Sequence, residues 1–148
     1  HQGIKIITKK NLIEIGHGQW EGKLESEIKL SWPDLLQKWK TSPETVQMPE
    51  GENIQEVSTR SIIAWEEICN ELNNNETALV VAHDAVNKTI LCHLLGLTPS
   101  EIWMVKQGNG GITVIDIEKE ESKPDIISCL NVTSHLGGLI DVTTAGAL

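Results

Sequence analysis

His83 and Asp84 stand where an apolar run, residues 77–82 (TALVVA), meets a segment of helical character that begins at about residue 85. In open α/β sheets the ligand site lies outside the carboxyl ends of the strands, so a histidine at this junction has the expected place for a ligand contact. The N-terminus of a helix adds free backbone N–H groups and the positive end of the helix dipole, and both favour an anion. The junction therefore predicts a phosphate-type anion site. The alternative is a histidine that is only hydrogen-bonded within a loop.

A second group of candidate residues lies in LIEIGHGQWEG, residues 12–22, which carries Glu14 and His17 next to a glycine-rich turn. A carboxylic acid that is partly buried can keep its proton and give it to a leaving oxygen. The alternative for Glu14 is a solvated carboxylate, as most glutamates are. We expect the carboxyl group of Glu14 and the imidazole of His83 to converge on one anion pocket at the rim of a layered sheet.

The elements that would position these residues alternate between strand and helix. Apolar and β-branched runs predict strands at residues 4–8, 77–82, 111–117 and 125–130. Helical spacing predicts helices at residues 31–40, 53–72 and 85–95, the second with Asn53 and Glu56 as a capping box. Such an alternation is typical of a layered α/β sheet.

The composition limits the classes of partner. The chain has 148 residues, which fits a single domain over residues 1–148, with a weakly patterned tail of uncertain structure at residues 137–148. The net charge of −9 argues against binding to nucleic acid or anionic membranes, because it would repel their phosphates. No apolar run is long enough to cross a bilayer. The three widely spaced cysteines indicate reduced thiols in a cytoplasmic protein.

Neither a metal nor another cofactor is expected. The five histidines show no metal-ligand spacing. The glycines of QGNGGI, residues 107–112, precede a strand instead of linking a strand to a helix, so they do not predict a nucleotide-binding loop.

Four segments, in order, resemble the later motifs of the histidine phosphatase superfamily, which contains the cofactor-dependent phosphoglycerate mutases and many broad phosphatases. They are NLIEIGHGQWEGK (11–23), PEGENIQEVSTR (49–60), ALVVAHDAVNKTILCHLLGL (78–97) and LNVTSHL (130–136). The sequences of these segments resemble those of the phosphatase members more closely than those of the true mutases. The resemblance implies an α/β three-layer sandwich with a mostly parallel sheet, phosphoglycerate mutase-like and incomplete at the N-terminus.

The resemblance also implies roles for individual residues. In the family, a histidine in an Arg-His-Gly motif attacks phosphorus, a second arginine and a second histidine hold the phosphoryl oxygens, and a glutamate protonates the leaving group. Glu14 matches that proton donor and His83 matches the second histidine. His17 matches a position that often contacts substrate, and the backbone N–H of Asp84 would help to hold phosphate. The implied activity is hydrolysis of a small phosphorylated metabolite without a cofactor.

The chain departs from the family pattern at the nucleophile. It contains no Arg-His pair, and its only arginine, Arg60, lies in the predicted helix 53–72, where a structural role such as an ion pair is expected. Phosphoryl transfer depends on positioning and on stabilising charge on the phosphoryl oxygens, so Glu14 and His83 alone cannot form the covalent intermediate. We expect the chain to be the carboxyl-terminal part of a longer phosphatase and to be inactive by itself.

A smaller departure is Asp84, because the family commonly has glycine there. Its carboxylate is expected to cap the helix that begins at Ala85. Lys88, one turn later, could reach toward phosphate or be solvated, and we expect it to be solvated.

Other functions stay open. A domain that keeps the fold without the nucleophile could be a pseudo-phosphatase with a binding or regulatory role, and a phosphoglycerate mutase is a further alternative. An Arg-His-Gly motif upstream of His1 would favour the enzyme. The sequence identifies neither the substrate nor the oligomeric state, although an incomplete sheet could pair with a second copy of the chain or with a missing N-terminal segment.

Overall fold

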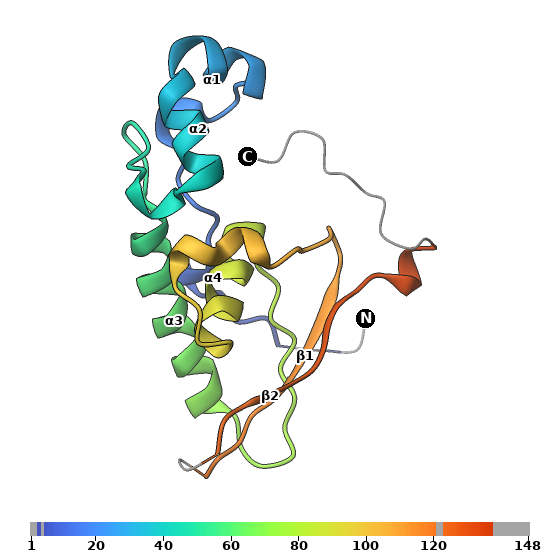
Figure 1. Ribbon diagram of the computed structural model, residues 1–148. Coiled ribbons are helices and arrows are strands. Elements are labelled where there is room, and N and C mark those ends of the chain that lie inside the picture. The colour runs from blue at the N-terminus through green and yellow to red at the C-terminus, as the bar shows by residue number, and fades with distance from the viewer. Residues whose placement is uncertain (1–2, 4, 121–122, 138–148) are drawn as a thin grey trace.

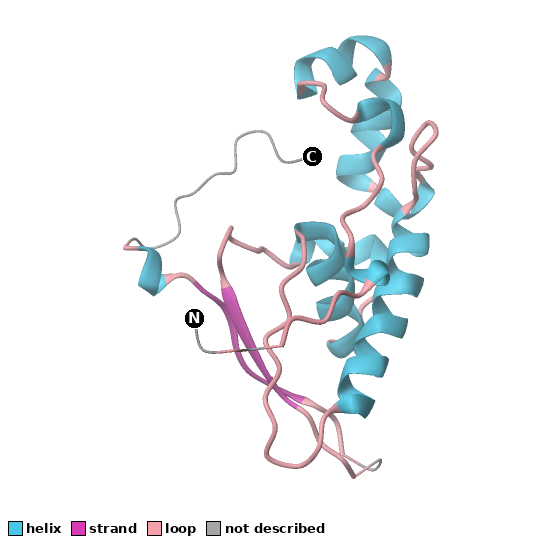
Figure 2. Cartoon of the chain, turned by 180° about the vertical axis from the view of Figure 1, so that it is seen from behind, coloured by secondary structure: helices cyan, strands magenta, loops and turns pink. Residues whose placement is uncertain are grey.

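The computed structural model describes residue 3, residues 5–120 and residues 123–137. Its helices are α1 (Glu25–Ser31), α2 (Pro33–Thr41), α3 (Ile54–Glu71) and α4 (Asp84–Leu94), and its strands are β1 (Ile112–Asp116) and β2 (Ile126–Val132). Short 3-10 helices lie before, between and after these elements, at Lys10–Leu12, Gly18–Trp20, Pro43–Thr45, Pro99–Met104 and Ser134–Leu136. Figure 1 shows α3 beside α4, the β1–β2 hairpin on the other side of α4, and α1 and α2 beyond one end of α3. The view from behind in Figure 2 shows the same order.

The long helix α3 begins at the predicted capping box. The Asn53 side chain accepts a hydrogen bond from the backbone N–H of Glu56 (2.9 Å), and the Glu56 carboxylate accepts one from the backbone N–H of Asn53 (2.8 Å). The face that α3 buries carries Ile54, Val57 and Ala64 together with two serines. One of them, Ser61, is hydrogen-bonded to Thr89 of α4 over 2.8 Å between the two hydroxyl oxygens. The predicted helix is therefore confirmed, and it is joined to α4 by a buried polar contact as well as by apolar packing.

The hydrophobic core lies between the helices and the loops that cover them. Its largest fully buried side chains include Trp20, Trp39, Ile28 and Met48. Ile28 comes from α1, a helix that the sequence did not predict, and α2 confirms the short helix predicted around Pro33. Tryptophan thus supplies the aromatic side chains of the core, since the chain has neither Phe nor Tyr.

Two of the four predicted strands are confirmed and pair with each other. β1 and β2 form an antiparallel hairpin in which Ile112 lies opposite Val132 and Asp116 lies opposite Ile126, with irregular register between these pairs. In the described part of the chain this is the whole sheet, so the predicted mostly parallel sheet between two helix layers is not formed there. Apart from Gly137, the predicted tail at 137–148 lies outside the described residues.

The strands predicted at residues 4–8 and 77–82 are not formed by the described residues of these two segments. Residues 5–8 and 77–82 form neither helix nor strand. A strand needs a neighbouring strand to receive its backbone hydrogen bonds, and the described residues offer none to these two segments. Leu79 and Val81, which a buried strand would cover, are 87% and 80% exposed.

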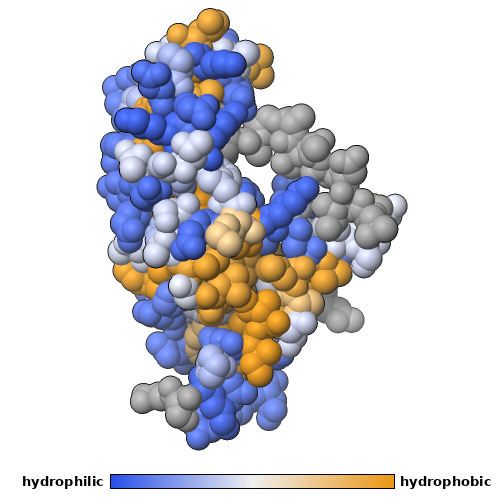
Figure 3. All heavy atoms as spheres, viewed as in Figure 1, coloured by the Kyte–Doolittle hydropathy of each residue, from blue (hydrophilic) through white to orange (hydrophobic). Residues whose placement is uncertain are grey.

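One face of the molecule is consequently apolar. Figure 3 shows apolar side chains gathered over the region of α4 and the hairpin. A groove of about 770 Å³ runs between residues 72–80, the end of α3 and β1, and both apolar and polar side chains line it. The chain therefore presents apolar side chains and open backbone where the predicted sheet would have continued.

Candidate active site

His83 and Glu14 approach each other at the N-terminus of α4. His83 is the residue that precedes the helix, with an extended backbone (φ −118°), and its Nδ1 lies 3.9 Å from Oε2 of Glu14. The two side chains are 56% and 36% exposed, so both can be reached from solvent. The expected convergence of the two side chains is confirmed, while their catalytic roles stay predictions.

The surroundings of this pair favour an anion. The first backbone N–H groups of α4 have no acceptor within the helix, and the positive end of the helix dipole lies there. A protonated His83 would add a donor and a charge next to these N–H groups. A phosphoryl oxygen could therefore be held by the imidazole and the N–H groups at the start of α4, near the Glu14 carboxyl group.

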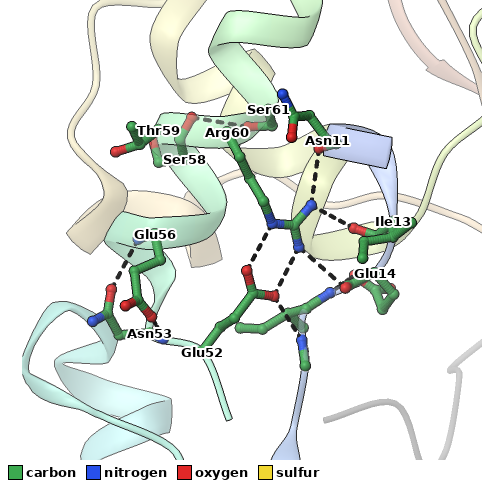
Figure 4. Close-up of polar contacts among 12 residues, drawn as sticks. Asn11, Ile13, Glu14, Glu52, Asn53, Glu56, Ser58, Thr59, Arg60 and Ser61 are labelled. Atoms are coloured by element: carbon green, nitrogen blue, oxygen red, sulfur yellow. Dashed lines mark hydrogen bonds and ion pairs between the residues drawn. The ribbon is translucent and has the colours of Figure 1, made fainter. Parts of the chain in front are cut away.

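The backbone around Glu14 is held from α3 by Arg60 (Figure 4). Nη1 of Arg60 donates hydrogen bonds to the carbonyl oxygens of Asn11 (2.9 Å) and Ile13 (2.7 Å), and Nη2 donates to that of Glu14 (3.1 Å). The predicted structural role of Arg60 is confirmed, and its ion-pair partner is Glu52, with Nε lying 2.7 Å from Oε1.

Glu52 extends the same network to the other side of Glu14. Its Oε2 accepts hydrogen bonds from Nη2 of Arg60 (2.9 Å) and from the backbone N–H of Gly16 (2.8 Å). Burial by itself would raise the pKa of Glu52, but the hydrogen bonds from Arg60 and Gly16 and the charge of Arg60 lower it below its ordinary value. The sequence analysis missed Glu52. The spacing from Glu52 to Arg60 was the available signal, but residue 52 precedes the helix, so helical periodicity does not place it next to Arg60.

Two glycines let the loop before α3 press against the turn that follows Glu14. A Cβ atom on Gly51 would lie 2.3 Å from the carbonyl oxygen of Gly16, and one on Gly18 would lie 2.1 Å from that of Pro49. Gly18 also has a positive φ of 55°, a backbone conformation that residues other than glycine rarely adopt. Close backbone contact follows, and Gln19 N–H donates to the Pro49 carbonyl oxygen over 2.8 Å.

His17 lies on this turn, partly buried. Its Nδ1 is 3.1 Å from the sulfur of Met48. Burial lowers the pKa of His17, although the charges of Glu14 and Glu21 act in the opposite direction. A neutral imidazole would contact a ligand through a hydrogen bond and not through a positive charge. In the described residues no hydrogen bond or ion pair joins His17 to Glu14 or His83.

The structure corrects the prediction for Asp84. The helix begins at Asp84 itself, and His83 is the capping residue, without a side-chain hydrogen bond to the helix. Because Asp84 lies in the first turn, its carboxylate faces the residue four positions on and accepts a hydrogen bond from Nζ of Lys88 over 2.7 Å. The expectation that Lys88 is solvated was also wrong, because its side chain is buried and its Nζ lies 4.8 Å from the ring centre of Trp103. Neither residue contacts Glu14 or His83 through a polar bond within the described residues.

Metal-binding clusters and thiol groups are the other reactive features to consider in the part of the chain that the structure describes. No group of three or more His, Cys, Asp or Glu side chains is arranged to hold a metal ion there. The cysteines are free, and burial raises the pKa of the Cys69 thiol to about 11, so this thiol is protonated at neutral pH.

Among the described residues, no helix has both the length and the apolar character needed to cross a membrane.

The comparison with known families identifies the superfamily of the chain. The sequence model of the histidine phosphatase superfamily, branch 1, matches residues 1–128. The chain belongs to this superfamily. The resemblance that the four motifs indicated is thereby confirmed.

Several proteins to which this superfamily member is similar are named as phosphatases. It is 31% identical over 136 residues to phosphoserine phosphatase 1 of Hydrogenobacter thermophilus, covering 92% of this chain and 63% of that protein. Among solved structures it is similar to YhfR of Bacillus stearothermophilus, with a TM-score of 0.79 and 24% identity over 86% of this chain and 62% of that one. It is also similar to the α-ribazole phosphatase of Shigella flexneri, with a TM-score of 0.75 and 19% identity over 88% and 62% of the two chains.

These structural likenesses show an α/β fold of the phosphoglycerate mutase-like type. The histidine phosphatase chain described here spans slightly less than two thirds of the length of these relatives. Somewhat more than one third of each of these three relatives thus has no counterpart in this chain.

Proposed function

We propose that the full-length protein containing this chain is a phosphomonoesterase that hydrolyses a small phosphate ester through a phosphohistidine. Glu14 is the proton donor, and His83 holds a phosphoryl oxygen. The observation that supports this most directly is the 3.9 Å approach of Glu14 Oε2 and His83 Nδ1 at the start of α4. The names of the relatives point to phosphate esters as the class of substrate.

The proposed reaction has two steps. A histidine supplied by a segment outside these 148 residues attacks phosphorus, the ester P–O bond breaks, and the leaving oxygen takes a proton from Glu14. Water then attacks the phosphohistidine, giving up a proton to Glu14, and inorganic phosphate leaves. In both steps His83 and the N–H groups at the start of α4 stabilise charge on the equatorial oxygens.

The proposal includes a larger sheet than the described one. In the full-length protein, residues 77–82 would be an inner strand of a mostly parallel sheet between two layers of helices. Three observations support it: the exposure of Leu79 and Val81, the groove beside residues 72–80, and the shorter length of this chain compared with its relatives. A strand with apolar residues on both faces is typical of a sheet that is covered on both sides.

The test compares the full-length protein with the 148-residue chain on p-nitrophenyl phosphate. We expect hydrolysis by the full-length protein, a loss of at least about 100-fold in kcat for His83→Ala, and no hydrolysis by the chain alone. Hydrolysis by the chain alone that His83→Ala abolishes would contradict the need for a further segment. Full activity of the His83→Ala protein would contradict the role of His83.

A second candidate function is a binding domain without catalysis. One observation favours it. Arg60 is the only arginine of the chain, and it is bonded to Glu52 and to backbone oxygens, so it is not available to bind a phosphoryl group. The gene sequence upstream of His1 separates the two candidates. An Arg-His-Gly motif there supports the enzyme, and its absence supports a domain that binds phosphate esters without cleaving them.

A further inference from the structure

Arg60 has no donor left for a substrate. A guanidinium group has five N–H donors. Two bind the Glu52 carboxylate, through Nε to Oε1 (2.7 Å) and Nη2 to Oε2 (2.9 Å). The other three bind the carbonyl oxygens of Asn11, Ile13 and Glu14, at 2.9, 2.7 and 3.1 Å. The only arginine of the chain therefore acts on the backbone that carries Glu14.

The pair of Arg60 and Glu52 holds this backbone on both sides of Glu14. Arg60 binds carbonyl oxygens up to residue 14, and Glu52 accepts the N–H of Gly16 over 2.8 Å. Glu14 itself accepts one hydrogen bond, from the N–H of its neighbour Ile15 to Oε1 (2.9 Å), which leaves Oε2 toward His83. The place of the Glu14 carboxyl group is thus set by the backbone on which it stands.

That backbone has little regular structure of its own. Around Glu14 the chain has a three-residue 3-10 turn at Lys10–Leu12, and residues 13–17 belong to no helix or strand. Loops of this kind are the parts of a fold that open most easily. The contacts with Arg60 and Glu52 tie the loop to α3, the longest helix described.

We propose that Arg60 and Glu52 are positioning residues for catalysis, because they fix the loop 11–16 so that the carboxyl group of Glu14 faces the leaving oxygen. The inference rests on the proposed function, in which Glu14 is the proton donor. A misplacement of about 1 Å of a reacting group can cost a factor of about 100 in rate, so a loosened loop would reduce proton transfer without removing the acid.

The chemistry of the pair fits this task. An arginine and a carboxylate joined by two parallel hydrogen bonds have a fixed mutual geometry, which a lysine cannot reproduce. The two side chains are 16% and 28% exposed, which limits screening by solvent. An arginine fixed in this way lets one helix residue hold three backbone carbonyl groups, those of Asn11, Ile13 and Glu14, at and before the acid.

A purely structural role would give a different result from a positioning role. Proton donation is important when the leaving group is a poorly acidic alcohol and much less important when it is p-nitrophenolate. A variant with a misplaced Glu14 should therefore lose activity selectively on an alkyl phosphate. A variant that is merely less stable, or that binds phosphate less well, should lose activity on both esters alike.

The experiment uses the full-length protein with p-nitrophenyl phosphate and an alkyl phosphate monoester, both assayed well below the unfolding temperature. The variants are Glu14→Gln, Arg60→Lys, Arg60→Met and Glu52→Gln. Lys9→Met is the matched control, because Lys9 also ties this segment to α3, through Glu67 (3.0 Å) and Glu71 (2.7 Å), without touching the loop at Glu14.

We expect Glu14→Gln to lower kcat/KM, which reports the formation of the phosphohistidine and not its hydrolysis, by about 100-fold or more on the alkyl ester and much less on the aryl ester. Arg60→Lys, Arg60→Met and Glu52→Gln should show the same selectivity in kcat/KM, with a loss of about 10-fold on the alkyl ester. Lys9→Met should keep the ratio of the two activities. If Arg60→Met does not fold, Glu52→Gln and Arg60→Lys carry the test, since both keep the size and most of the polarity of the original side chain.

The outcomes are distinguishable. A selective loss in Glu14→Gln with equal or no loss in the Arg60 and Glu52 variants would overturn the positioning role and leave the proposed function standing. Absence of a selective loss in Glu14→Gln would overturn the proton-donor role of Glu14 and the positioning role with it.

Discussion

At the scale of single residues, the approach of Glu14 to His83 was predicted from the sequence, and the contacts that hold the backbone around Glu14 were predicted only in part. Both stand in motifs that are continuous in the sequence, and each motif predicts its own chemistry. The sequence also predicted a structural ion pair for Arg60, but not its partner. Glu52 is joined to Gly16, which is 36 positions away, and only the folded chain brings these segments together.

The Arg60–Glu52 pair predicts a dependence of stability on pH. The pKa of Glu52 is lowered from its ordinary value of 4.5, so its contribution to the free energy of unfolding is fully present above pH 4.5 and is lost as the pH falls through the pKa of the folded state. Glu52→Gln should lower the free energy of unfolding by about 2 kcal/mol at pH 7, because it removes charge-assisted hydrogen bonds.

Urea denaturation at several pH values measures this effect. The difference between the wild-type chain and Glu52→Gln should shrink as the pH falls below 4.5. A difference that stays constant from pH 7 to pH 3 would show that the carboxylate charge of Glu52 does not stabilise the fold.

At the scale of elements, helices were predicted better than strands, for a physical reason. The start of α3 depends on Asn53 and Glu56, three positions apart, and such local contacts are readable from the sequence. A strand depends on a neighbour, and residues 77–82 have none in the described chain. The apolar run at residues 77–82 favours a buried strand, but the described residues form no strand there. Helix α1 was missed because its contribution to the core comes largely through Ile28 and not through a long apolar stripe.

The contact between the loop before α3 and the Glu14 turn gives a prediction with an internal control. Gly51→Ala should lower the free energy of unfolding by about 1–3 kcal/mol, because its Cβ would be forced against the Gly16 carbonyl oxygen. Gly16→Ala should cost much less, because its Cβ would meet Glu52 at an ordinary 3.7 Å. Thermal unfolding of both variants measures the difference, and equal midpoints would contradict the close contact.

At the scale of the whole molecule, the exposed apolar face predicts that one substitution has two different effects. Leu79 and Val81 are 87% and 80% exposed here, so Leu79→Ser or Val81→Ser should change the stability of the 148-residue chain by less than about 0.5 kcal/mol. In the full-length protein, where we propose that residues 77–82 form an inner strand, each should cost about 2–4 kcal/mol.

Chemical denaturation of both proteins with and without these substitutions tests the larger sheet. An equally small effect in the full-length protein would show that residues 77–82 stay exposed there, and the proposed parallel sheet would then be wrong. Exposed Thr77→Ser, in the same segment, serves as the control that should be neutral in the chain alone.

Because all five N–H groups of Arg60 are hydrogen-bonded, its guanidinium group can also serve as a chemical probe of local opening. Reagents such as phenylglyoxal attack guanidinium groups, and this chain offers them a single target. With all five N–H groups engaged, labelling must wait until the loop around Glu14 separates from α3. The rate of adduct formation, followed by mass spectrometry, would therefore report how often that separation occurs in the otherwise folded chain.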